Sequence, residues 1–107
     1  MAQPETRLVE RMKRAILVRW PDAFVVKLHG NPYQSAGLPD LLVVLRGRVV
    51  GVEAKAPRIG ESREHALGRV TLRQRAVLDR IEKAGGVAGV ALTVDEAVDI
   101  VARAERT

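Results

Sequence analysis

The feature that most constrains the fold is a pair of apolar runs separated by a short turn. Residues 41–45 read LLVVL, residues 48–55 read RVVGVEAK, and Arg46-Gly47 lies between them. Two runs rich in β-branched residues on either side of a two-residue turn containing glycine are typical of a β-hairpin. The stretch therefore predicts two neighbouring antiparallel strands.

The register of this hairpin determines where its few charged residues lie. A two-residue loop, or a four-residue loop with the same centre, sets Asp40 directly opposite Glu53, whereas a three-residue loop breaks that register. Opposite residues share a face of the sheet, with Cβ atoms about 5 Å apart. Side chains alternate along a strand, so Lys55 lies on the face of Glu53. The hairpin predicts that Asp40, Glu53 and Lys55 converge at one end.

Two acids and a lysine in this arrangement favour one kind of chemistry. Neighbouring carboxylates repel each other, and a divalent cation compensates for the repulsion. Hard oxygen ligands suit Mg²⁺ or Mn²⁺, and a lysine can hold a nucleophilic water or steady a phosphate. The set indicates phosphodiester hydrolysis. Two alternatives stay open: Asp40 as a plain turn residue, and Glu53 with Lys55 as an ion pair of an edge strand.

The rest of the chain predicts an α/β domain. Helices are expected at residues 4–19 and 71–84, and strands at residues 23–28 and 87–92. Thr71 caps the second helix, and a capping box from Thr93 to Glu96 opens a last helix that ends near Ala104. Residues 57–69 show no periodicity and are expected to form a long charged loop. The order α-β-β-β-α-β-α predicts a mixed sheet flanked by helices.

Composition limits the setting and the partners. The chain has 107 residues, which suits a single domain spanning 1–107, and it has no cysteine, which excludes disulfides and thiolate zinc sites. The sequence contains no run of signal-peptide or membrane-helix character, so we expect a soluble intracellular protein without a membrane partner. A net charge of +5 favours a polyanionic partner, although it also fits an ordinary solvated surface.

Asp40 followed by Glu53-Ala54-Lys55 resembles the P-D…(D/E)-x-K signature of the PD-(D/E)XK nuclease superfamily. Residues 27–57 and 71–98 are similar to the VRR-NUC branch, the virus-type replication-repair nucleases, and the resemblance runs from Glu5 to about Val101. It implies a restriction-endonuclease-like α-β-β-β-α-β core with a C-terminal helix. It also implies that Asp40, Glu53 and the Ala54 backbone carbonyl bind Mg²⁺ or Mn²⁺, and that Lys55 is catalytic.

Two further residues match the family pattern. Gln74 corresponds to a glutamine near the active site of this branch, and it is included among the catalytic candidates. Glu5 corresponds to an acid that completes or orients the metal shell, and it shares the helical face of Leu8 that points at the sheet. Each has a local alternative: Gln74 completes a capping box with Thr71, and Glu5 complements the helix dipole.

Candidate DNA contacts lie in two segments. Loop residues could contact a phosphate or stack on a base, although structural roles fit them as well. The charged segment at 57–69 is expected to approach DNA, with a solvated loop as the alternative. The candidates are His29, Asn31, Tyr33, Arg58, Arg63 and Arg69.

The resemblance is to minimal stand-alone forms of phages and bacteria, so a cytoplasmic, bacterial or phage-encoded protein is expected. It implies a Mg²⁺- or Mn²⁺-dependent, structure-selective DNA endonuclease of the Holliday-junction-resolving type. The partners would be branched or four-way-junction DNA and a second copy in a homodimer. The alternatives are a flap or nicking endonuclease of replication and repair, a non-catalytic DNA-binding relic of the fold, and an unrelated interaction protein.

Overall fold

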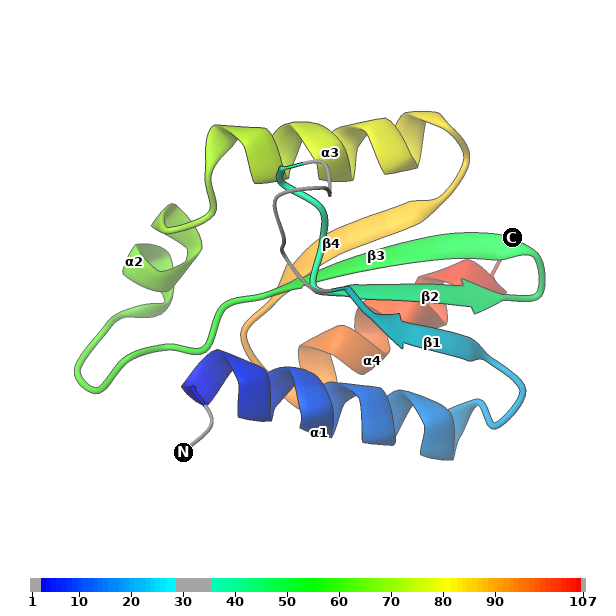
Figure 1. Cartoon of the computed structure of the whole chain (residues 1–107), viewed down its shortest axis with the longest axis horizontal. Helices are drawn as coiled ribbons and strands as arrows, with labels where there is room; N and C mark the ends of the chain where they lie inside the picture. Colours follow the sequence, from blue (N-terminus) through cyan, green and yellow to red (C-terminus); the bar gives the residue numbers. More distant parts are fainter. Residues whose placement is uncertain (1–2, 29–35, 107) are drawn as a thin grey trace.

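The computed structural model describes residues 3–28 and 36–106. The regular elements run in the order α-β-β-β-α-α-β-α, followed by a short 3-10 helix (Figure 1). They are α1 (Pro4–Arg19), β1 (Phe24–Lys27), β2 (Leu41–Leu45), β3 (Arg48–Ala54), α2 (Arg63–Gly68), α3 (Leu72–Lys83), β4 (Val87–Ala91), α4 (Val94–Ala102) and η1 (Arg103–Glu105).

The strands form one mixed sheet, as the sequence predicted, and their order in it is β1-β2-β3-β4. The first three strands are antiparallel neighbours, and β4 runs parallel to β3 because α3 carries the chain back across the sheet. Helices α1 and α4 lie together on one side of the sheet, and α3 lies on the other side (Figure 1). None of the described helices is long and apolar enough to cross a membrane.

The hairpin of β2 and β3 has the predicted register. Leu45 pairs with Arg48 and Leu41 pairs with Val52, so the connection is the two-residue loop Arg46-Gly47. Both loop residues have positive φ angles, 52° and 82°, which is the type I′ turn whose twist matches that of the strands. Because Leu41 pairs with Val52, the next position outward sets Asp40 opposite Glu53, as the sequence predicted.

Apolar side chains fill the space between the sheet and the pair α1–α4. The amphipathic stripe of α1 is buried there, together with the inward-facing rows of β2 and β3 and with residues of α4. The largest fully buried side chains are Met12, Ile16, Leu41, Val43, Val50, Val52 and Val101. This core covers one face of the hairpin. Helix α3 and the charged residues Asp40, Glu53 and Lys55 lie on the other face.

The approach of α3 depends on small residues beneath it. A Cβ atom at Gly86 would lie 2.6 Å from the Val49 carbonyl oxygen, and one at Gly51 would lie 2.8 Å from Ile81 Cδ1. The backbone oxygen leaves no room for a side chain at position 86, whereas a side chain at position 51 would require the end of the Ile81 side chain to shift. Helix α3 therefore packs directly over the backbones of β3 and β4 and covers that half of the face.

The prediction of a structureless loop over residues 57–69 is wrong, because residues 63–68 form α2. Ser62 caps this helix by accepting a hydrogen bond of 3.1 Å from the His65 N–H, and Ala66 is fully buried. A helix of six residues with one buried side chain is too short to produce a periodic pattern, which needs a window of about eleven residues or more.

The capping box predicted at Thr93 is only half formed. Thr93 Oγ1 accepts the Glu96 N–H at 3.1 Å, but the Glu96 carboxylate accepts from the Leu92 N–H instead of from the cap residue. The same carboxylate also pairs with Arg63 from α2. The last helix ends at Ala102 and continues as η1 to Glu105, close to the predicted end.

Candidate active site

Asp40 is anchored to the strand that faces it. Its Oδ2 accepts a hydrogen bond of 2.8 Å from the Ala54 N–H, just beyond the last ladder pair of β2 and β3. Its backbone carbonyl accepts from the Leu28 N–H at 2.8 Å, where the chain leaves β1. The residue is thus held from both sides by backbone groups, and its carboxylate is fixed next to Glu53.

Glu53 lies near the end of β3 and is only 3% exposed, the one buried charged residue in the described part of the chain. Its Oε2 lies 3.5 Å from Lys55 Nζ. Its Oε1 is buried and has no hydrogen-bond partner among the described residues. Burying a polar oxygen without a partner costs free energy, and this oxygen is free of protein partners in the described part of the chain.

Lys55 continues β3 by one position, since its N–H donates to the Ala91 carbonyl at 3.0 Å. Its side chain is 11% exposed and lies on the side of the sheet that carries Glu53. The structure therefore brings Asp40, Glu53 and Lys55 together, as the hairpin register predicted. Their catalytic roles stay predictions.

The electrostatics of the site show an excess of negative charge. Burial, followed by the charge of Asp40, raises the pKa of Glu53 to about 7, against the opposing effect of Lys55. Burial also raises the pKa of Asp40, while its hydrogen bond from Ala54 lowers it. The charge of Glu5 raises the pKa of both acids. One lysine does not balance these carboxylates.

The donor set fits a divalent cation of the Mg²⁺ or Mn²⁺ type. The unpartnered Glu53 Oε1 and the carboxylate of Asp40 are hard oxygen ligands, and such ions keep several waters in addition. Within residues 3–28 and 36–106, no three His, Asp or Glu side chains surround one common ion position. The roles of Glu5 and of the Ala54 carbonyl as further ligands stay predictions.

Glu5 lies in the first turn of α1 and is bound by an arginine. Its Oε1 accepts a hydrogen bond of 3.0 Å from Arg69 Nη1. Arg69 also donates to the Ala56 carbonyl and to both oxygens of Glu61, and its side chain is only 18% exposed. The sequence proposed Arg69 as a DNA contact, but the structure engages most of its N–H groups within the protein.

Gln74 completes the capping box of α3. Its Oε1 accepts the Thr71 N–H at 2.9 Å, and Thr71 Oγ1 accepts the Gln74 N–H at 3.1 Å. The structure thus confirms the alternative in which Gln74 caps the helix together with Thr71. A role of its amide nitrogen in the active site stays a prediction.

The remaining DNA-contact candidates are dispersed. His29, Asn31 and Tyr33 lie outside the described residues. Arg58 is exposed and lines a hollow of about 210 Å³ that Glu5 and Arg69 also line.

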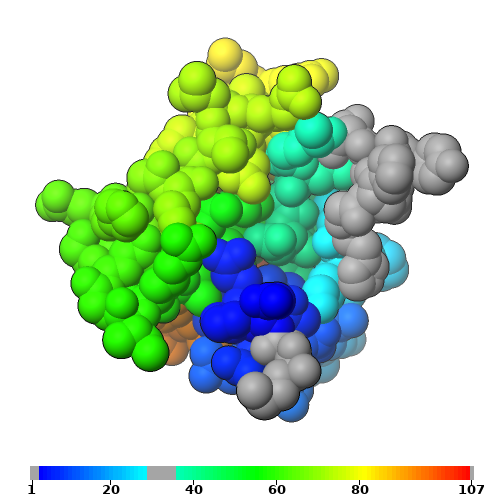
Figure 2. All heavy atoms as spheres, turned by 60° about the vertical axis from the view of Figure 1, so that its left-hand side comes forward, coloured from blue at the N-terminus to red at the C-terminus, as the bar shows by residue number. Residues whose placement is uncertain are grey.

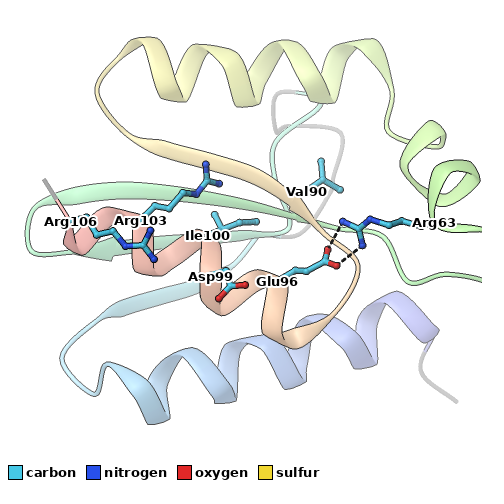
Figure 3. A pocket seen from close by; sticks show the side chains of 7 residues that line it. All are labelled: Arg63, Val90, Glu96, Asp99, Ile100, Arg103 and Arg106. Atoms are coloured by element: carbon cyan, nitrogen blue, oxygen red, sulfur yellow. Dashed lines mark hydrogen bonds and ion pairs between the residues drawn. The ribbon is translucent and has the colours of Figure 1, made fainter.

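Arg63 is bound by an acid of α4. It pairs with Glu96 and lines a hollow of about 580 Å³ along α4. Figure 3 shows this side chain reaching from α2 toward Glu96, with Arg103 and Arg106 farther along. Asp40, Glu53 and Lys55 do not line this hollow.

The segments that carry the site meet on one face of the molecule. Figure 2 shows the N-terminal end of α1, the chain that follows β3 and the chain that leads into β2 gathered there. Sequence reasoning did not identify Glu61 and the ion pairs of Arg69 at this edge. Arg69 and Glu5 are 64 positions apart, and no local pattern connects them.

A solved structure described as "VRR_NUC domain" is similar to this chain, with a TM-score of 0.62 and 25% sequence identity. The alignment covers 94% of this chain and 97% of that chain. No protein-family model and no curated protein matches the sequence. The likeness therefore extends over nearly the full length of both chains.

Proposed function

The chain has the VRR-NUC fold, and we propose that it is a divalent-metal-dependent, structure-selective DNA endonuclease that cuts four-way junctions as a homodimer. One observation carries the proposal. A buried glutamate, Glu53, has an unpartnered oxygen next to Asp40 and Lys55, at the end of a hairpin that fixes their spacing. This arrangement lowers the stability of the folded protein, and a bound cation and phosphate would offset that cost.

Each of the three residues has a separate task. Asp40 is held by the Ala54 N–H through Oδ2, and its carboxylate would bind the cation. Glu53 would contribute its unpartnered Oε1 to the same ion. Lys55 is held near Glu53 Oε2, and its ammonium orients the attacking water and the scissile phosphate. Mg²⁺ or Mn²⁺, when bound, supplies positive charge that stabilises the negative charge developing on the phosphate.

The protonation of Glu53 sets the pH range of the reaction. Because its pKa is raised to about 7, this carboxyl group is largely protonated at pH 6 and largely ionised at pH 8. Only the ionised form binds a cation well, so metal must displace a proton at lower pH. Metal binding and cutting therefore strengthen as the pH rises through about 7.

The substrate assignment rests on charge and symmetry. A net charge of +5 favours the DNA backbone, and Arg58 stands exposed beside the site. One active site cuts one strand, so paired cuts in a four-way junction need two copies of the chain. A homodimer with one site per copy meets this need.

The test is a panel of labelled four-way junctions, flaps and plain duplexes, incubated with Mg²⁺ or Mn²⁺ and run beside Lys55→Ala. Paired symmetric nicks on the junction, absent from the variant, support the proposal. Preferential cutting of flaps, or single nicks, would make the chain a flap or nicking endonuclease with the same site. DNA binding with no cutting of any substrate would make it a non-catalytic relic.

A further inference from the structure

Arg69 joins three segments at the edge of the candidate active site. It directly follows α2, and its guanidinium donates four hydrogen bonds. Nη1 donates to Glu5 Oε1 at 3.0 Å, and Nη2 donates to the Ala56 carbonyl at 2.7 Å. Nε and Nη2 donate to the two oxygens of Glu61 at 2.9 and 3.0 Å. Only one of the five N–H groups is left for other contacts.

Glu61 is held in place by several hydrogen bonds besides those from Arg69. Its side chain is 4% exposed, and it also accepts from the Arg58 N–H at 2.9 Å and lies 2.7 Å from His65 Nδ1. These bonds, with that of Arg69 first, lower the pKa of Glu61 to about 2. The carboxylate therefore stays charged throughout the neutral range, and the paired guanidinium keeps its position.

The other two acceptors of Arg69 both adjoin the proposed catalytic residues. Glu5 is close enough for its charge to raise the pKa of Asp40 and of Glu53. Ala56 directly follows Lys55 in the chain, and its carbonyl is held by the same guanidinium. Arg69 engages only Oε1 of Glu5, and Oε2 has no hydrogen-bond partner in the described part of the chain.

We infer that Arg69 is a positioning residue, which fixes the Glu5 carboxylate beside the Asp40–Glu53 pair. The inference rests on the proposed metal-dependent function. A guanidinium can bridge acceptors in three directions at once, whereas a lysine ammonium keeps the charge but loses this planar fork. The bond to Glu5, made while Glu61 and the Ala56 carbonyl hold the same guanidinium in place, thus depends on the shape of Arg69.

The test measures Mn²⁺ binding by calorimetry, without DNA, at pH 8 and well below the melting temperature of each variant. We expect Arg69→Lys to weaken binding about tenfold, as is usual for groups that orient metal ligands. Glu5→Gln should weaken binding to a similar extent. The double variant should bind no more than about twofold more weakly than Glu5→Gln alone, because Arg69 acts through Glu5.

The matched control is Arg19→Lys. Arg19 pairs with a carboxylate, Glu105, at 3.5 Å on the surface, and neither residue belongs to the site. This variant should bind Mn²⁺ as the wild-type protein does. Melting temperatures of all variants separate a loss of stability from a loss of metal affinity.

Two results would overturn the positioning role and leave the proposed function intact. The first is wild-type Mn²⁺ affinity in Arg69→Lys despite a lower melting temperature, which would make the cluster purely structural. The second is additive losses in the double variant, which would show that Arg69 acts independently of Glu5. Failure of the wild-type protein itself to bind Mn²⁺ would instead overturn the metal-dependent function, and with it the inference.

Discussion

The Asp40 carboxylate accepts a hydrogen bond of 2.8 Å from the Ala54 N–H, so an acid at the start of one strand is bound to the backbone of the next. Because Ala54 is the neighbour of Glu53, this bond ties the separation of the two acids to the hairpin ladder. A rigid spacing of this kind is what a metal site needs before the ion arrives.

The buried charge of Glu53 should make wild-type stability decrease with rising pH. The folded-state pKa is about 7 and the ordinary value is 4.5, so between these values the unfolded chain binds fewer protons and folding loses stability as the pH rises. At pH 8 we expect Glu53→Gln to be more stable than wild type, by on the order of 2 kcal/mol. At pH 5 the two should be nearly equal.

Urea unfolding at both pH values, without added metal, measures this difference. The control is Glu82→Gln, which removes an exposed carboxylate from α3 and should change stability little at either pH. A Glu53→Gln variant that is less stable than wild type at pH 8 would contradict the assignment of an uncompensated buried charge.

Added Mn²⁺ should raise the melting temperature of the wild-type protein, and more at pH 8 than at pH 6. An ion that binds only the folded state stabilises it by about 2.7 kcal/mol at a hundredfold excess over its dissociation constant. At pH 6 the ion must first displace the proton of Glu53, whose pKa is about 7. Thermal melts with Ca²⁺-free buffers measure the shift, and Asp40→Asn should show little of it. An equal shift in that variant would place the ion elsewhere.

Gly37→Ala should destabilise the fold more than Gly60→Ala. Both glycines have left-handed φ angles, 87° and 77°. A Cβ atom at Gly37 would lie 2.9 Å from the Arg73 carbonyl oxygen, whereas a Cβ atom at Gly60 meets nothing within 4 Å. We expect about 1 kcal/mol from backbone strain alone at Gly60.

The loss at Gly37 should be larger by at least about 1 kcal/mol, because α3 must also shift. Urea unfolding of the two variants at one pH gives the comparison. Equal losses would show that α3 moves away from this turn without cost.

The hairpin could be predicted from sequence because its determinants are local. A turn of two residues with left-handed φ angles fixes the register, and the register fixes which side chains share a face. The convergence of Asp40, Glu53 and Lys55 therefore follows from the local sequence of the hairpin. The capping box of Thr71 and Gln74 is equally local.

The edge of the site could not be predicted in this way. Helix α2 has a cap, Ser62, and one buried residue, Ala66, which is too little for a periodic signal. The bonds of Arg69 to Glu5 and Glu61 join positions that only the folded chain brings together. A charged segment without periodicity therefore gave the expectation of a loop facing DNA, and the structure shows a helix and an internal ion-pair cluster.

The central claim is that Asp40, Glu53 and Lys55 form one metal-dependent site for DNA cleavage. The most direct measurement is single-turnover cleavage of a labelled four-way junction at pH 8 with Mn²⁺, by wild type, Asp40→Asn and Lys55→Ala, with junction binding measured in parallel. The account predicts that each substitution lowers the cleavage rate at least about a hundredfold while junction binding survives. Cleavage by both variants at the wild-type rate would contradict it.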